Sequence, residues 1–209
     1  IYINKVKADP SFFHMKQMAQ KVQLARQMAK QSGKQIVVVY CNEYDQTWWP
    51  NWGPNSMDTG GVGGSEEAVI FLTKELHQMY GYHVEVYGEP LPKDWGEHAE
   101  TGVWWLPHQI YDAKNPVVKP DIFVAWRYHI STILGDVAKQ RYLWLQDVSP
   151  RYKLGYTNEY VDTLSGIFTL SNFHGRLGLS NYAVTTKTHV TPNALDPKYF
   201  YNGPNHNYN

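Results

Sequence analysis

An alternation of short apolar runs with helical segments constrains the fold of this chain most. The first run, Ile36 to Tyr40, is continuously apolar and β-branched, which is typical of a strand buried on both faces of a parallel sheet. Further runs lie near residues 83–88, 121–126, 141–146 and 167–170, and a short strand in THVTPNAL closes the series. Strands that alternate with helices predict a Rossmann-like, doubly wound α/β fold with a mainly parallel sheet.

An extra helix is predicted before the first strand. Asp9 and Pro10 suit the N-cap and first helical position, an apolar stripe runs from Met15 to Ala29, and Gly33 stops the pattern. This helix either packs on the main domain or ends an upstream module. We therefore divide the chain into an N-terminal helix at 1–33, a Rossmann-like domain at 34–200 and a polar tail or linker at 201–209.

Composition excludes several classes of protein. The 209 residues carry 19 Lys and Arg against 19 Asp and Glu, so no overall field attracts nucleic acid or an anionic membrane. No apolar run approaches the roughly twenty residues that a membrane-spanning helix needs. The single Cys41 excludes an internal disulfide framework and a thiolate zinc site, and no other metal-ligand spacing is present. We expect a cytoplasmic protein without a transmembrane segment.

A glycine-rich loop predicts an anion site. Its glycines are Gly60, Gly61, Gly63 and Gly64. They lead into an amphipathic helix that reaches Leu76, for which Ser65 is the expected N-cap. Unpaired N–H groups and the helix dipole favour an anion there, although the glycines could instead serve only a tight turn. The Walker A lysine is absent, and the dinucleotide fingerprint fails because Glu66 occupies its third glycine position.

Polar residues that follow the predicted strands are the other site candidates. Because parallel strands place ligand residues at their C-terminal ends, the positions of interest are Asn42, Trp126, Arg127, Gln146, Asp147 and Ser171. Asp147 either acts in catalysis or caps a turn, and Arg127 either binds an acceptor carboxylate or phosphate or pairs with a nearby acid. Ser171 and Asn172 are expected to cap a helix, with His174 on its surface.

Two aromatic segments are candidates for sugar contact. The loop from Asn42 to Thr59 contains Trp48, Trp49 and Trp52, whose rings could stack on an acceptor sugar or instead seal the edge of the sheet. The segment from Pro90 to Pro116 is similarly aromatic, and we expect a hairpin insertion beside that loop.

The order of the motifs GGVGGSE, PDIFVAW, LQD, IFTLSNFHGRLG and VTPNALDPKYF resembles the N-terminal half of family 4 glycosyltransferases with the GT-B fold. The likeness runs from about Gln35 to Phe200. It implies an acceptor-side Rossmann-like domain that faces a second, C-terminal domain which holds a nucleotide-sugar and is missing from this chain. It further implies transfer to a carbohydrate, glycan or protein acceptor with retention of configuration, without a metal and with the nucleotide-sugar as co-substrate.

The same resemblance assigns roles to individual residues. Gly61, Gly63, Gly64 and Ser65 would face the donor diphosphate, and Asp147 would lie beside the transferred sugar. Gln146 stands where many members of the family have His, so an imidazole role is not carried over and Asp147 becomes the expected catalytic contact.

Two alternatives remain open from the sequence. One is an NAD-dependent sugar-nucleotide oxidoreductase or epimerase that holds a ribose with Glu89, against which the failed fingerprint and the absence of a Tyr-x-x-x-Lys pair argue. The other is a noncatalytic carbohydrate-binding module built on the Trp-rich loops.

Overall fold

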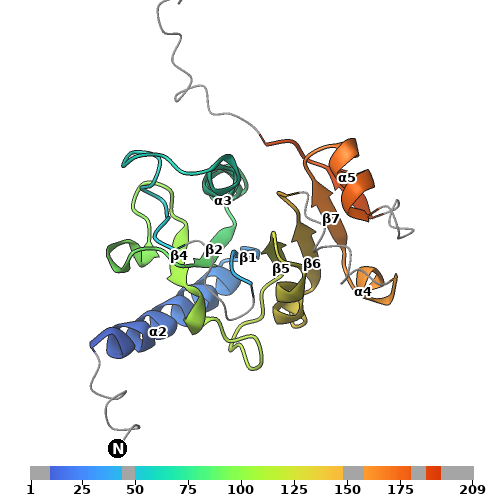
Figure 1. The fold of residues 1–209 in the computed structure, drawn as a ribbon. Coiled ribbons are helices and arrows are strands. Elements are labelled where there is room, and N and C mark those ends of the chain that lie inside the picture. Colours follow the sequence, from blue (N-terminus) through green and yellow to red (C-terminus); the bar gives the residue numbers. More distant parts are fainter. Residues whose placement is uncertain (1–9, 44–49, 148–157, 180–186, 194–209) are drawn as a thin grey trace, which may run out of the picture.

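The computed structural model describes residues 10–43, 50–147, 158–179 and 187–193 (Figure 1). The strands are β1 (Ile36–Tyr40), β2 (His83–Gly88), β3 (Gly96–Glu97), β4 (Trp104–Pro107), β5 (Ile122–Trp126), β6 (Gln140–Trp144), β7 (Gly166–Thr169) and β8 (Thr188–Val190). The α-helices are α2 (Pro10–Gln31), α3 (Gly64–Tyr80), α4 (Asn158–Asp162) and α5 (Asn172–Leu179). Short 3₁₀ helices are η1 (Pro92–Asp94), η2 (His108–Ile110) and η3 (His129–Gly135).

The strands form one mainly parallel sheet, which confirms the predicted α/β class. Within the described residues the sheet has eight strands in the order β3-β4-β2-β1-β5-β6-β7-β8, and β3 pairs antiparallel with β4. Strand β1 lies between β2 and β5 and is parallel to both. The strand order therefore reverses at β1, and α/β proteins bind ligands outside the C-terminal strand ends at such a reversal.

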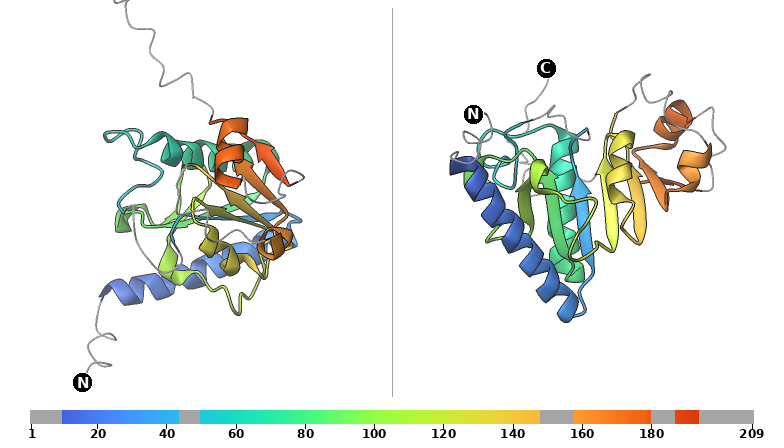
Figure 2. Two further views of the ribbon diagram at one scale, coloured as in Figure 1. Left: turned by 45° about the vertical axis from the view of Figure 1, so that its right-hand side comes forward. Right: turned by 90° about the horizontal axis from the view of Figure 1, so that it is seen from below.

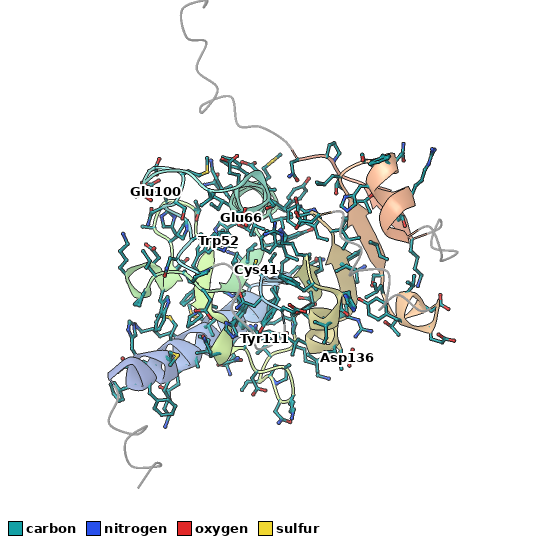
Figure 3. The ribbon with its side chains drawn as sticks, viewed as in Figure 1. Cys41, Trp52, Glu66, Glu100, Tyr111 and Asp136 are labelled. Carbon is teal, nitrogen blue, oxygen red and sulfur yellow. The ribbon has the colours of Figure 1, made fainter. Side chains whose placement is uncertain are left out.

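Helices α2 and α3 cover opposite faces of the sheet (Figures 1 and 2). Side chains of β1 alternate between two buried clusters: Val39 packs with Val69 of α3, and Tyr40 packs with Val22 of α2. Tyr111 lies on the α2 side of the sheet (Figure 3). The alternation explains why β1 is apolar at every position, since both of its faces are covered.

The predicted N-terminal helix is present, and a buried ion pair joins it to the sheet. Arg26 of α2 donates from Nε to Oε1 of Glu85 at 2.7 Å and from Nη2 to Oε2 at 2.6 Å. The two residues are 1% and 0% exposed. Burial raises the pKa of Glu85, but the charge and hydrogen bonds of Arg26, with His83, outweigh burial and lower this pKa to about 2. Helix α2 is thus packed on the main sheet.

Two elements differ from the sequence prediction. The segment 130–139 follows a strand, so the alternation of strands and helices predicts an α-helix there, but it contains the 3₁₀ helix η3. Gly135 of η3 lies so close to β5 that a Cβ would clash with the Phe123 ring. Strand β4 was not predicted as part of the main sheet, because WWLP is short and Pro107 ends it. The expected hairpin is formed by β3 and β4. It lies beside the loop that precedes the glycines, because Nε2 of His98 in the hairpin is 3.1 Å from Oδ1 of Asn55 in that loop.

In the part of the chain that the structure describes, no helix has both the length and the apolar character to cross a membrane.

Candidate functional site

Arg127 connects three elements at the C-terminal edge of the sheet. It follows β5, donates from Nη1 to Oε1 of Glu66 at 2.9 Å and donates from Nε to Oδ2 of Asp147 at 2.6 Å. Its Cζ atom lies 4.6 Å from the centroid of the Trp126 ring. Glu66 belongs to the first turn of α3 (Figure 3), and Asp147 follows β6. Of the two roles that the sequence leaves open for Arg127, pairing with an acid is the one found, and two acids take part.

The backbone of Arg127 adopts an unusual conformation. Its φ is +68°, in the left-handed region that residues other than glycine rarely adopt. Two main-chain hydrogen bonds hold this turn: Arg127 N donates to the carbonyl of Trp144 at 2.8 Å, and Tyr128 N donates to that of Trp126 at 2.8 Å. The turn directs the guanidinium back toward the N-terminus of α3, where it meets Glu66.

The charges of this cluster do not balance. Burial lowers the pKa of Arg127, but the hydrogen bond and charge of Asp147, together with Glu66, outweigh burial and raise it. One guanidinium therefore faces two carboxylates. The side chain of Glu66 is 11% exposed, whereas that of Asp147 is 47% exposed. Of the two acids, Asp147 is the one that can reach a ligand.

Helix α3 begins two residues earlier than predicted. Its N-cap is Gly63, not Ser65, and the hydroxyl of Ser65 donates to Oε2 of Glu66 at 2.9 Å. The carbonyl of Gly63 accepts from the N–H groups of Glu66 and Glu67. A Cβ on Gly63 would lie 2.5 Å from Oε2 of Glu66. The Glu66 carboxylate thus folds back over the helix N-terminus, where the dipole and Arg127 both favour a negative charge, and a Ser cap is not needed.

The glycine loop itself is open. Gly60, Gly61, Gly63 and Gly64 are exposed, and a Cβ on Gly64 would meet nothing within 4 Å. Gly60 and Gly61 have φ values of +144° and +79°, which only glycine adopts readily. The loop therefore presents its main chain to solvent beside Asp147 and Arg127.

Asn193, which sequence reasoning did not single out, connects this loop to β6. From its position after β8 it donates from Nδ2 to Oε1 of Gln146 at 3.1 Å and to the carbonyl of Gly64 at 3.4 Å. Gln146 is 7% exposed, and its Nε2 has no hydrogen-bond partner within the described ranges. The motif PNALD contains Asn193, but only the fold shows that it returns to the glycine loop.

His174 is buried, so its predicted surface position is wrong. It is 4% exposed, its Nδ1 accepts from the N–H of Leu170 at 3.2 Å, and its Nε2 lies 3.1 Å from the carbonyl of Asp147. Because Leu170 N can only donate, Nδ1 is the acceptor and the proton is on Nε2. Ser171 caps α5 as predicted, since its Oγ accepts from His174 N at 3.0 Å. His174 fixes the main chain of Asp147 while Arg127 fixes its side chain.

Trp52 is a core residue and not an acceptor platform. It is 7% exposed, and its ring centroid lies 5.6 Å from those of both Trp105 and Trp126 (Figure 3). These rings occupy the surface that a sugar would need, and burying all three is favourable. The alternative that the loop seals the sheet fits this residue. Trp48 and Trp49 lie outside the described residues.

A second polar cluster lies at the ends of β2 and β4. Nδ1 of His108 lies 2.5 Å from Oε1 of Glu89, and Nε2 of Gln109 donates to the same oxygen at 2.9 Å. Nδ1 of His108 is also 2.9 Å from Nδ2 of Asn42, which follows β1. Glu89 directly follows β2, which is where dinucleotide-binding folds place a ribose-binding acid. Its carboxylate already contacts the side chains of His108 and Gln109.

In the described residues no group of three or more His, Cys, Asp and Glu side chains could hold a metal ion. Comparison of the chain with models of protein families, with curated proteins and with solved structures found no match.

Proposed function

We propose that this chain is the acceptor-side domain of a glycosyltransferase that moves a sugar from a nucleotide-sugar to a carbohydrate, glycan or protein acceptor. The observation that carries the proposal is the Asp147 carboxylate, half exposed and held 2.6 Å from Arg127 beside the open Gly63–Gly64 turn. The order of motifs in the sequence and the reversal of strand order at β1 support the same assignment.

The glycine loop is proposed to contact the donor diphosphate through its main chain. Because the Gly63 carbonyl already accepts from the N–H groups of Glu66 and Glu67, the N–H groups of Gly64 and Ser65 are the ones proposed to meet the diphosphate, and Gly64 offers no side chain to obstruct an approach. Side-chain charge does not attract an anion here, because Arg127 is paired with Glu66 and Asp147. Within the described residues, this edge of the sheet can therefore bind an anion only through main-chain N–H groups. Gly61 lies near Gly64 and Ser65 in the sequence and belongs to the same proposed phosphate site.

Asp147 is proposed to act on the sugar. Departure of the diphosphate leaves positive character on the sugar carbon, and a carboxylate fixed beforehand stabilises that charge more than it stabilises the bound substrate. Arg127 and His174 position Asp147 from its side chain and its main chain. Because Asp147 and the glycine loop are both exposed, they would form one wall of a cleft, and a second Rossmann-like domain that holds the nucleotide would form the other.

Titration of the ¹⁵N-labelled chain with inorganic pyrophosphate tests the phosphate contact directly. We expect saturable changes in amide chemical shift at Gly63, Gly64 and Ser65. We expect none at Gly81, which is the C-cap at the opposite end of α3. Gly64→Val should abolish the shifts, whereas Met79→Val, on the exposed C-terminal turn of the same helix, should not. Absence of any loop shift at millimolar pyrophosphate would contradict the proposal.

An NAD-dependent enzyme is the second candidate, because Glu89 directly follows β2 where dinucleotide-binding folds place their ribose-binding acid. The contacts of Glu89 with His108 and Gln109 and the long segment between β1 and α3 argue against it. Fluorescence of NADH decides between the candidates: enhancement that Glu89→Ala removes would favour the dinucleotide, and no enhancement is expected for the glycosyltransferase.

A noncatalytic sugar-binding module loses support because Trp52 is buried.

A further inference from the structure

A hollow of about 360 Å³ opens between α3 and the part of the sheet formed by β5, β6 and β7. Its walls are mainly apolar and include Phe71, Leu72 and Phe168. Its volume falls within the range of small-molecule sites, roughly 300–1,000 Å³. Leu72 is 38% exposed, so the hollow is reached from solvent past this side chain.

Three polar atoms of the residues that line this hollow are buried and unpaired. Nε1 of Trp144, Oγ1 of Thr191 and Oδ1 of Asn193 have no hydrogen-bond partner in the described segments. Trp144 as a whole is 6% exposed. Buried polar groups are nearly always paired in folded proteins, because an unpaired one is costly. Three of them around one apolar hollow therefore indicate a ligand that supplies the missing partners.

The chemistry of these atoms defines the ligand. The indole N–H of Trp144 can only donate, the amide oxygen of Asn193 can only accept, and the hydroxyl of Thr191 can do either. A matching compound must carry both an acceptor and a donor. Of the described residues that line the hollow, Glu75 alone is charged and it is exposed, so an anion is repelled at the rim and no buried charge selects a cation.

We infer that the hollow binds a small, neutral, largely apolar compound that carries a hydrogen-bond acceptor and a donor, for which an aromatic amide is a suitable probe. This inference does not rest on the proposed sugar transfer, because it concerns the space between α3 and strands β5, β6 and β7 and not the exposed edge that carries Asp147. Asn193 links the two places: its Oδ1 is the unpaired acceptor, while its Nδ2 donates to Gln146 and to the carbonyl of Gly64.

Benzamide and benzoate form a matched pair of probes, since both have a phenyl ring but only benzamide is neutral and has N–H donors. We expect saturation-transfer NMR with the 209-residue chain to show benzamide binding at millimolar concentration or below, and benzoate at least tenfold more weakly. No benzamide binding, or equal binding of the two, would overturn the inference.

Variants place the bound probe. Leu72→Trp should fill the hollow and weaken benzamide at least tenfold, whereas Met79→Trp, on an exposed turn of the same helix, should leave it unchanged. Thr191→Val keeps the shape but removes the hydroxyl, and we expect a threefold or greater loss of affinity. If Leu72→Trp bound benzamide as tightly as the wild type and its melting temperature showed an intact fold, the probe would have to bind outside the hollow. This result would overturn the assignment.

Discussion

Arg127 and Asp147 form an ion pair across the ends of two adjacent parallel strands, with Nε of Arg127 2.6 Å from Oδ2 of Asp147. The pair is asymmetric, because the Arg127 side chain is 11% exposed and that of Asp147 is 47% exposed. Arg127 also contacts the buried carboxylate of Glu66. Arg127 therefore behaves as a structural anchor, and Asp147 behaves as the accessible end of the cluster.

The first prediction concerns this anchor. Arg127→Ala should lower the free energy of unfolding by about 2–4 kcal/mol, because it leaves the Glu66 carboxylate buried without its partner. Chemical denaturation measures the change. The double variant Glu66→Gln with Arg127→Ala should be clearly more stable than the sum of the two single effects predicts. Additive single effects would show that the two side chains do not interact in solution.

A second prediction concerns acid stability. The pKa of Glu85 is lowered to about 2 in the fold, so the ion pair with Arg26 contributes full stability above the unfolded value, about 4.5, and this contribution is lost as the pH falls toward 2. Glu85→Gln should remove this component of the acid transition. It should also cost about 3–5 kcal/mol at neutral pH, because the Arg26 charge stays buried.

Denaturation curves at pH 7, 4 and 2.5 test the acid prediction. Glu97→Gln, which alters an exposed carboxylate of β3, serves as the control and should leave the free energy of unfolding unchanged. If Glu85→Gln kept the full acid dependence of the wild type, another carboxylate would have to account for it.

The third prediction concerns His174. His174→Phe keeps an aromatic ring at this position but removes both ring nitrogens, so the N–H of Leu170 and the carbonyl of Asp147 lose their partner. The free energy of unfolding should fall by about 1–3 kcal/mol. Hydrogen exchange at Leu170 should accelerate to match. An unchanged exchange rate at Leu170 would show that His174 does not make this bond.

The fourth prediction separates two neighbouring glycines. Gly63→Ala should destabilise the fold, because its Cβ would lie 2.5 Å from a Glu66 oxygen that Ser65 also holds. Gly64→Ala should be neutral or stabilising by up to about 1 kcal/mol, because the site is open and lies in the first turn of α3. Thermal unfolding of both variants compares them directly, and the reverse order of stability would contradict the described geometry.

Local patterns were sufficient for much of the fold. The strand near 36–41 is found at Ile36–Tyr40, and the predicted helix stop at Gly33 fits an α2 that ends at Gln31 with Gly33 at φ +74°. Both signals depend only on nearby residues, namely an unbroken β-branched run and a glycine after a helical stripe.

Contacts between distant segments explain what the sequence did not predict. His174 is buried because α5 packs its first turn against the end of β6, and Glu66 replaces Ser65 at the helix start because Arg127 lies opposite. Asn193 meets Gly64 only after the chain has crossed the sheet. None of these pairings has a local signature.

The proposed role of Asp147 is tested most directly by Asp147→Asn in the natural full-length protein. The assay measures nucleoside diphosphate released from a panel of nucleotide-sugars, together with the melting temperature. We predict that turnover falls about a hundredfold, equivalent to roughly 2–4 kcal/mol, while stability is nearly unchanged because the side chain is half exposed. Unchanged turnover per folded molecule, with a lowered melting temperature, would make Asp147 a structural residue and contradict its role in sugar transfer.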